Sequence, residues 1–229
     1  MSTVITKTAP GRAKTELSHE AIVERALAIA DAEGLEAVTI RRVALEFSVT
    51  PMALYWHVQN KDELLAAMGR SFFDGIGQRY DRTGPWDDQI RGVLEALIEA
   101  LRKHPASAML TLGEVLRCEE GQEIAEFALD VLRTAGFDVV EASEIARLAL
   151  QIAIMLVTQQ AGEELQVAVE ERDSVLAEKR AAIRQLPVNR FPRLVEAADA
   201  LTDCDDVEGY YASGVDMFVS GVRARHRRR

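Results

Sequence analysis

The sequence lacks the features that mark several large classes of protein. It contains no run of 18 uninterrupted apolar residues, so no membrane-spanning helix is predicted. The N-terminal residues have no apolar core of the signal-peptide type, and we therefore expect a cytoplasmic protein. Only two cysteines are present, Cys118 and Cys204, and their wide separation favours free thiols over a disulfide. The four histidines are scattered, so no metal or other cofactor is expected.

Patterns of catalytic residues are also missing. The sequence shows no paired catalytic carboxylates, no nucleophile–histidine arrangement and no glycine-rich phosphate loop. Its charge runs, Glu119-Glu120 and Asp205-Asp206, are typical of solvated surface. No strand-like alternation or internal repeat is evident, whereas apolar residues recur every three or four positions. The predicted fold is therefore all-α, and 229 residues suffice for a small helical unit and a larger one.

The charge is unevenly distributed along the chain. The formal net charge is −10, yet residues 1–61 hold seven basic and seven acidic groups. Residues 71–222 hold fourteen basic and twenty-eight acidic groups, and residues 223–229 add five arginines. An acidic region is repelled by DNA, with screening beyond about 8–10 Å at physiological salt. The neutral N-terminal part is thus the part that can approach a duplex, while Lys7, Arg12 and Lys14 either follow DNA or form a solubilising tail.

The most informative stretch is residues 38–64, VTIRRVALEFSVTPMALYWHVQNKDEL. Its first part predicts a two-turn helix that Thr39 caps, with an apolar stripe of Ile40, Val43, Ala44 and Phe47. After a turn at Ser48-Val49, a second short helix is expected to begin at Pro51, with Thr50 as its cap. Asn60, followed by Glu63, predicts a third helix start with a capping box.

A short helix, a tight turn and a second short helix make a helix-turn-helix. The second helix of such a unit fits the DNA major groove, which is about 12 Å wide. Arg41 and Arg42 lie in the first turn of the first helix, and Tyr55, His57 and Lys61 supply donors suited to phosphate oxygens. The plainer alternative is a helical hairpin whose arginines lie on a solvated surface.

The ordered set Thr-x-Arg…Thr-Pro…Leu-Tyr-Trp-His-Val-x-Asn-Lys resembles the TetR family of one-component bacterial repressors. The segment ALYWHVQNKDELL is similar to that family's recognition helix and the start of its fourth helix. The Tyr-Trp-His triplet is closest to the tetracycline-repressor-like branch. The motif covers roughly residues 18–75, and beyond it only the helical layout resembles the family. The resemblance implies a flexible arm over 1–17, a DNA-binding domain over 18–62 and a helical ligand-binding and dimerisation domain over 63–225.

The resemblance also implies roles in DNA binding. Arg41 and Thr39 should meet base edges or phosphate, while Met52 and its neighbours offer apolar contact to a thymine methyl. Pro51 stands where the tetracycline branch has a base-reading polar residue, so the operator sequence does not transfer. Trp56 is expected in the core of the unit. The predicted DNA-binding residues are Thr39, Arg41, Arg42, Thr50, Pro51, Met52, Ala53, Tyr55, His57 and Lys61.

Further helices are expected along the whole chain. One precedes the helix-turn-helix, from Ser18 as cap to Glu33, with Gly34 as the stop. A long helix over 61–79 should join the N-terminal unit to the rest. Others are expected at 86–103, 106–116, 119–134, 139–164, 193–201 and 206–224, and the charged stretch 163–185 is compatible with a helix.

The helices at 139–164 and 206–224 fit a four-helix bundle formed with their copies in a second chain, as the resembled family dimerises. Apolar stripes also arise in ordinary cores, so both uses stay open. A dimer would let two recognition helices reach two half-sites. The predicted dimerisation residues are Ile145, Ile152, Leu156, Tyr211, Val215, Phe218 and Val222.

By resemblance, the chain is a repressor that binds a palindromic operator as a dimer and is released by a small molecule acting through helix 61–79. Gly77, Val93 and Thr111 stand where the tetracycline branch has drug- and metal-binding polar residues, so a tetracycline–magnesium inducer is not expected. A mostly apolar set favours a hydrophobic or aromatic effector, although residues of these types more often belong to an ordinary core or a solvated face: Phe72, Trp86, Val93, Leu97, Met109, Arg147, Gln151, Met155 and Gln159.

Two alternatives compete with this hypothesis. The first is an all-α small-molecule-binding protein or enzyme in which the helix-turn-helix is only structural. The second is an architectural DNA-binding protein without a ligand, which would leave the acidic bundle unexplained. The partners expected under the main hypothesis are double-stranded DNA, a small-molecule effector and a second copy of the chain, and no membrane.

Overall fold

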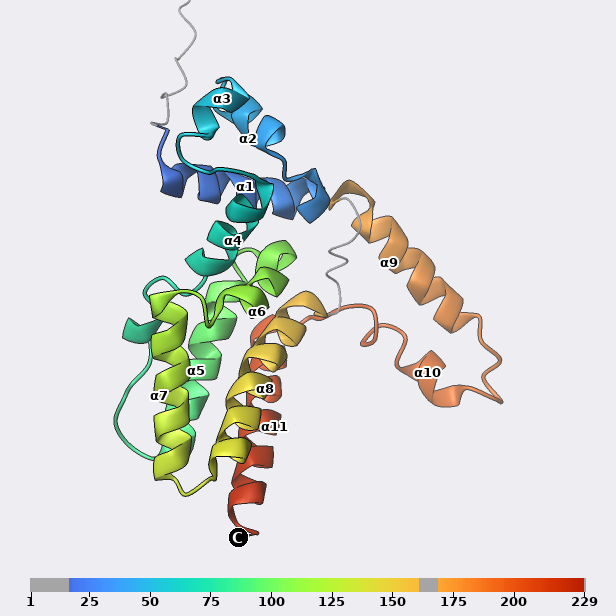
Figure 1. The fold of residues 1–229 in the computed structure, drawn as a ribbon. Coiled ribbons are helices and arrows are strands. Elements are labelled where there is room, and N and C mark those ends of the chain that lie inside the picture. The colour runs from blue at the N-terminus through green and yellow to red at the C-terminus, as the bar shows by residue number, and fades with distance from the viewer. Residues whose placement is uncertain (1–16, 161–168, 229) are drawn as a thin grey trace, which may run out of the picture.

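The computed structural model describes residues 17–160 and 169–228. Within these ranges it contains eleven α-helices, three short 3-10 helices and no β-strand, which confirms the predicted all-α fold. None of the described helices combines the length and apolar character needed to cross a bilayer. Figure 1 shows the arrangement of the helices, which are α1 (His19–Glu33), α2 (Ile40–Glu46), α3 (Pro51–Leu54), α4 (Lys61–Ser71), α5 (Trp86–Leu101), α6 (Thr111–Glu114), α7 (Glu119–Thr134), α8 (Val139–Thr158), α9 (Val169–Arg184), α10 (Pro192–Glu196) and α11 (Val207–His226).

Helices α1, α2 and α3 form a small unit at one end of the molecule, which we call the head (Figure 1). The predicted limits of α1 are confirmed, because the Ser18 side chain accepts a hydrogen bond from the Ala21 N–H at 3.1 Å and Gly34 ends the helix at a φ of 87°. Thr39 caps α2 as predicted, accepting from the Arg42 N–H at 3.0 Å. These local bonds fix where the helices of the head begin.

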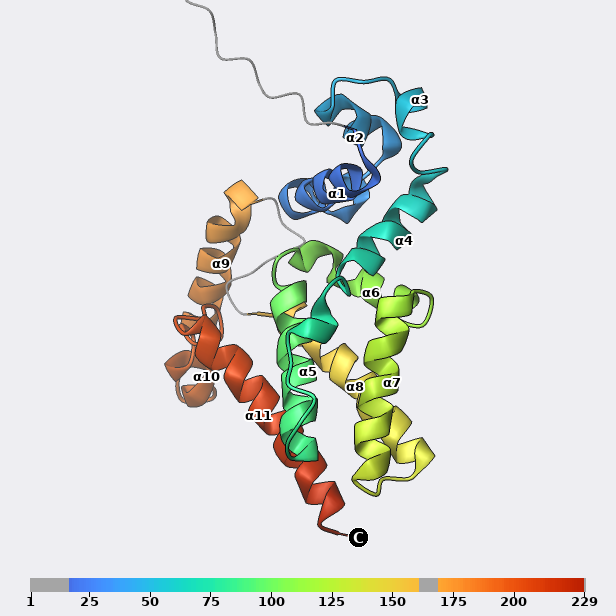
Figure 2. The ribbon, with the colours of Figure 1, turned by 90° about the vertical axis from the view of Figure 1, so that its left-hand side faces the viewer.

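Helix α4 leaves the head and enters the larger part of the molecule, which we call the body (Figure 2). It begins at the predicted cap Asn60, whose side chain accepts from the Glu63 N–H at 2.8 Å. The predicted end near Arg79 is wrong, because α4 ends at Ser71. Gly75 has a left-handed backbone with a φ of 67°, which no right-handed helix accommodates. A turn and the 3-10 helix η2 (Ile76–Gln78) follow, and they still bury Phe72 and Ile76.

The body consists mainly of α5, α7, α8 and α11 packed lengthwise (Figures 1 and 2). The 3-10 helix η3 (Pro105–Leu110) and α6 connect α5 to α7. One buried apolar cluster extends from the head through α4 into the body, with Ile22, Leu54, Met68, Leu94 and Val215 among its members. Helix α8 opens with a full capping box formed by Asp138 and Glu141 and ends at Thr158, earlier than the predicted 164; residues 161–164 lie outside the described residues.

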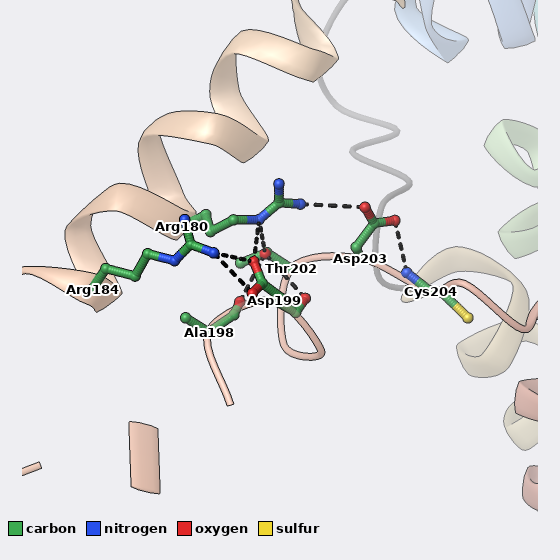
Figure 3. Close-up of polar contacts among 7 residues, drawn as sticks. All are labelled: Arg180, Arg184, Ala198, Asp199, Thr202, Asp203 and Cys204. Carbon is green, nitrogen blue, oxygen red and sulfur yellow. Dashed lines mark hydrogen bonds and ion pairs between the residues drawn. The ribbon is translucent and has the colours of Figure 1, made fainter. Parts of the chain in front are cut away.

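Helices α9 and α10 form an arm beside the bundle, and polar contacts hold it together (Figure 3). Arg184 Nη2 lies 2.8 Å from both carboxylate oxygens of Asp199, and Arg180 Nε donates to Thr202 Oγ1 at 2.9 Å. Between residues 171 and 206, the only buried residues are Ala198 and Thr202. The arm therefore has almost no apolar core of its own.

Candidate functional site

The turn between α2 and α3 sets the direction of the exposed helix. Ser48 adopts a left-handed backbone with a φ of 55°, and the Val49 N–H donates to the Ala44 carbonyl at 3.1 Å. The chain thereby reverses within a few residues, as a helix-turn-helix requires. The predicted cap of α3 is wrong in one detail. The Thr50 side chain makes no capping bond, and its backbone carbonyl accepts from the Ala53 N–H at 2.9 Å instead.

Helix α3 presents one face inward and the other outward. Leu54 and Val58 are buried in the head, whereas Met52 is 68% exposed and Tyr55 is also exposed. The prediction for Trp56 is wrong, because its side chain is 88% exposed. Helix α3 is only four residues long, and Leu54 is its one buried side chain. Val58, which follows α3, is buried as well. Trp56 in the intervening turn therefore points outward.

The residues predicted to bind DNA lie together on the surface of the head. They come from the start of α2, from α3 and the residues on either side of it, and from the start of α4. Thr39, Arg41, Thr50, Met52 and Tyr55 are exposed, and Arg42, Pro51, Ala53, His57 and Lys61 are partly exposed. Exposed Leu45 and Trp56 join the same part of the head. Three basic residues of the predicted N-terminal segment 1–17, Lys7, Arg12 and Lys14, lie outside the described residues.

Two neighbouring arginines of α2 have different surroundings. Arg42 Nη2 lies 2.6 Å from Glu33 Oε1 on α1, and Arg42 Nη1 lies 2.6 Å from Glu46 Oε1. The hydrogen bonds that Arg42 donates to Glu33 and Glu46 raise the pKa of Arg42, and the bond to Glu33 lowers the pKa of Glu33. Arg42 thus ties α2 to α1. Arg41 has no carboxylate partner among the described residues and is free to bind an anion.

The Glu33–Arg42 pair makes the stability of the head depend on pH. The pKa of Glu33 is lower in the folded protein than its ordinary value of 4.5. The pair therefore stabilises the head above pH 4.5, and this contribution is lost as the pH falls through the folded-state pKa. We expect Glu33→Gln to lower the melting temperature at pH 7, and we expect this difference to shrink as the pH falls below 4.5. Thermal unfolding of both proteins across this range measures the difference, and a pH-independent difference would contradict the role of the pair.

An apolar cleft of about 540 Å³ lies in the body between α5, α7 and α8. Val93 and Leu97 of α5 line it as predicted, together with Arg147 and Gln151 of α8. Leu112 of α6 and the following residues Val115 and Leu116 also line it. The lining residues that the sequence did not indicate are Phe73, Leu112, Val115, Leu116, Ile124, Ala125, Ala128, Leu129, Ser143, Ala146, Ala149 and Leu150. Ile124 and Ala128 stand four residues apart on α7, a spacing that could have indicated this wall.

Five predicted ligand-binding residues lie away from this cleft. Phe72 lines a different hollow between α1, α4 and α5, because the early end of α4 turns Phe73 into the cleft instead. Trp86 packs against Phe137 and His226 at the other end of the bundle, with ring centroids 5.6 and 5.2 Å away. Met109, Met155 and Gln159 are exposed and do not line the cleft.

The predicted dimerisation residues also lie elsewhere than expected, in the core of a single chain or at its edge. Ile145, Leu156, Tyr211, Val215 and Val222 are buried within a single chain, and Ile152 and Phe218 are partly buried. The strongest apolar stripes of α8 and α11 therefore face the chain's own core. The faces that a second copy can reach carry Leu148, Met155 and Met217, with Met155 53% and Met217 72% exposed.

The head and the body meet at a joint made by α1, α4, η3 and α6. Asp31 Oδ2 of α1 lies 2.6 Å from His104 Nδ1. Arg70 Nη1 of α4 lies 3.1 Å from Glu114 Oε2 of α6, and the Glu114 side chain is buried. Gly69 packs so closely that a Cβ there would lie 2.8 Å from the Leu110 carbonyl oxygen. Helix α6 thus contacts α4 on one side, and the neighbouring Leu112 and Val115 line the cleft.

Comparisons with known proteins agree with this division into head and body. Residues 22–68 match the family model "Bacterial regulatory proteins, tetR family", and residues 80–226 match "Tetracyclin repressor-like, C-terminal domain". The tetracycline repressor protein class D of Escherichia coli is 24% identical over 215 residues, covering 91% of this chain and 90% of its own.

Two solved structures are also similar. The Streptomyces coelicolor TetR family protein ActR in complex with (S)-DNPA has a TM-score of 0.63 and 26% identity, covering 91% of this chain and 98% of its own. BioQ with its natural double-stranded DNA operator has a TM-score of 0.55 and 29% identity, covering 69% of this chain and 99% of its own. Because the two family models together span the head and the body, the chain belongs to the TetR family of bacterial regulatory proteins, a family of transcriptional regulators and not of enzymes, and carries the tetracycline repressor-like C-terminal domain.

Proposed function

We propose that the protein is a ligand-responsive transcriptional repressor that binds a palindromic operator as a dimer and is released by a small hydrophobic or aromatic effector. The observation that carries this proposal is the joint between head and body. Helix α4 begins beside the residues proposed to contact DNA, and its other end packs on η3 and α6, whose Leu112 lines the apolar cleft. The similar proteins named above include one bound to an operator and one bound to a small molecule. A protein that binds chromosomal DNA in a bacterium acts in the cytoplasm.

The proposed docking places α3 in the major groove. Arg41, Met52 and Ala53 would reach base edges, while Tyr55, His57 and Lys61 would bind phosphate oxygens. Arg42 would act indirectly, because its bonds to Glu33 and Glu46 hold α2 on α1. We place the boundary between the DNA-binding domain (18–62) and the effector domain (63–225) at the start of α4.

A second copy would pack against the outer faces of α8 and α11. Besides Leu148, Met155 and Met217, the exposed face of α11 carries small residues, Ala212, Ser213, Ser220 and Gly221, that allow close approach of a helix. A two-fold dimer would present its heads to half-sites roughly 34–36 Å apart along the duplex. The effector must favour the arrangement that misses this spacing, so bound operator weakens effector binding by the same factor, typically about 5–150-fold.

The proposal is tested first by DNA binding. DNA from directly upstream of the protein's own gene should shift in a gel with two chains per site, and hydrophobic or aromatic compounds should release it. Binding that no such compound reverses would favour an architectural DNA protein. The absence of DNA binding would overturn the proposal.

The phosphate contacts are tested by substitution. Tyr55→Ala and Lys61→Ala should each weaken binding to every operator variant by on the order of tenfold, since a charge-assisted hydrogen bond is lost. Lys61→Ala should also reduce the slope of log affinity against log salt by about 1. Fluorescence anisotropy at several salt concentrations measures both. Arg227→Gln, which removes a positive charge from the opposite end of the molecule, serves as the control and should leave affinity unchanged (Figure 1). A Tyr55→Ala protein with unchanged affinity would contradict the docking.

A further inference from the structure

The apolar cleft contains polar side chains on one wall only. Its lining from α5, α6 and α7 is apolar, whereas α8 contributes Ser143, Arg147 and Gln151. These three stand four residues apart and therefore lie along one face of α8. The Ser143 hydroxyl already donates to the Val139 carbonyl at 2.7 Å. Arg147 is the one charged residue of the lining.

The guanidinium of Arg147 has no partner in the part of the chain that the structure describes. Glu144 stands three residues earlier on α8, within reach of such a pair, but its Oε2 faces Arg225 Nη2 at 3.4 Å. Glu141 also lies near Arg225, at 3.8 Å. Other arginines of the body do pair, since Arg91 lies 2.6 Å from Asp216 and Arg102 lies 2.7 Å from Glu208.

Residues 71–222 hold twice as many acidic as basic groups, yet Arg147 has no carboxylate partner among the described residues. Arg147 lines the cleft but is also exposed, so an uncharged ligand in the cleft would cover only part of the guanidinium without replacing the hydrogen bonds to water lost there, and a cationic ligand would be repelled. A carboxylate would satisfy it, because the planar guanidinium matches a carboxylate with two parallel N–H···O bonds. The acidic body repels anions elsewhere, so Arg147 would also determine where the anionic group is bound.

We propose that the effector is an amphipathic carboxylic acid. Its apolar part packs against Val93, Leu97 and Ile124, and its carboxylate binds Arg147, with the Gln151 amide as a second donor. This inference rests on the proposed function, since it assigns a chemical class to the effector of the same cleft.

The test compares acids with uncharged compounds of the same shape. Decanoic acid is paired with 1-decanol, and 2-naphthoic acid with 2-naphthalenemethanol. Binding of each compound to the full-length dimer is measured by calorimetry at pH 7, and operator release by fluorescence anisotropy. In the unchanged protein, at least one acid should bind at least tenfold more tightly than its alcohol and release the operator.

Substitutions then assign the preference to one side chain. Arg147→Gln should remove the preference for the acid: the affinity for the acid should fall at least tenfold, and the affinity for the alcohol should not change. Arg147→Lys should retain part of the preference. Arg79→Gln is the matched control, because Arg79 also has no ion pair among the described residues but lies outside the cleft, and it should behave as the unchanged protein.

Equal binding of acid and alcohol, or an acid preference that survives Arg147→Gln, would overturn the inference. Failure of both acids to bind would overturn it as well. If the operator is nevertheless bound and released by an uncharged hydrophobic compound, the proposed function stands without this inference. If no operator is bound at all, the proposed function itself fails.

Discussion

Leu54→Ala should abolish operator binding at concentrations where the unchanged protein is saturated. Helix α3 has four residues, too few to be stable without tertiary contacts, and Leu54 is its one fully buried side chain. Removing a buried leucine side chain costs about 2–5 kcal/mol, a large part of a total stability of roughly 5–15 kcal/mol. A loss of about 2.8 kcal/mol corresponds to a hundredfold change in an equilibrium constant. The lower end of the range, about 2 kcal/mol, corresponds to roughly thirtyfold, so operator affinity should fall at least about thirtyfold.

Met52→Ala provides the matched control for this substitution. It removes a side chain of similar size from the same helix, but from the exposed face. Its melting temperature should stay close to that of the unchanged protein, while its preference among operator sequences changes. Thermal unfolding and anisotropy with a set of operator variants measure both effects. A Leu54→Ala protein with normal stability and affinity would show that α3 is held by other contacts.

Gly69→Ala should uncouple the body from the head by overpacking their joint. The new methyl group would lie 2.8 Å from the Leu110 carbonyl oxygen and 3.0 Å from Cγ of Glu114. Neither the Leu110 backbone nor the buried Glu114 side chain can yield freely, so α4 must move away from η3 and α6. Overpacking of this kind costs about 1–3 kcal/mol. We expect a lower melting temperature, operator affinity reduced about tenfold or more, and a weaker response to effector.

Gly113→Ala is the control for the joint. Gly113 belongs to α6, and no atom lies within 4 Å of the position a Cβ would take, so this substitution should leave both affinities unchanged. Operator affinity is measured with and without effector for each protein. The ratio of operator affinity without effector to operator affinity with effector measures the coupling. If this ratio were the same in the Gly69→Ala protein as in the unchanged protein, coupling would have to run through contacts other than the packing of α4 on α6.

Local signals in the sequence predicted the head well. Ser18, Thr39 and Asn60 cap their helices through bonds to residues three positions later, and such bonds depend only on neighbouring sequence. The end of α4 was missed because Leu64, Met68, Phe72 and Ile76 keep a helical spacing past the point where the helix stops. The left-handed backbone of Gly75 decides this, and glycine in a sequence does not reveal its conformation.

The cleft and the outer faces of the body were harder to predict. Periodicity identifies the apolar side of α8 and α11 but does not say whether it meets the chain's own core or a second copy. Burial of Ile145 and Val215 within one chain answers this for the two helices. Likewise, Met155 and Leu150 both belong to α8, yet only Leu150 of the two lines the cleft. Which residues of α8 line the cleft depends on where α5 and α7 pack against it. Such information comes from packing between distant segments.

The short segment η3 carries an evolutionary consequence. It contacts α1, α4, α5, α6 and α8, and two buried polar atoms without a hydrogen-bond partner among the described residues, Asp31 Oδ1 and Ser107 Oγ, occur in this region. A single replacement between residues 104 and 110 therefore touches helices of both the head and the body without changing a residue proposed to contact DNA or a residue that lines the cleft. Under the proposed function, one mutation here would change how strongly effector binding and operator binding are coupled, while the operator and the effector stay the same.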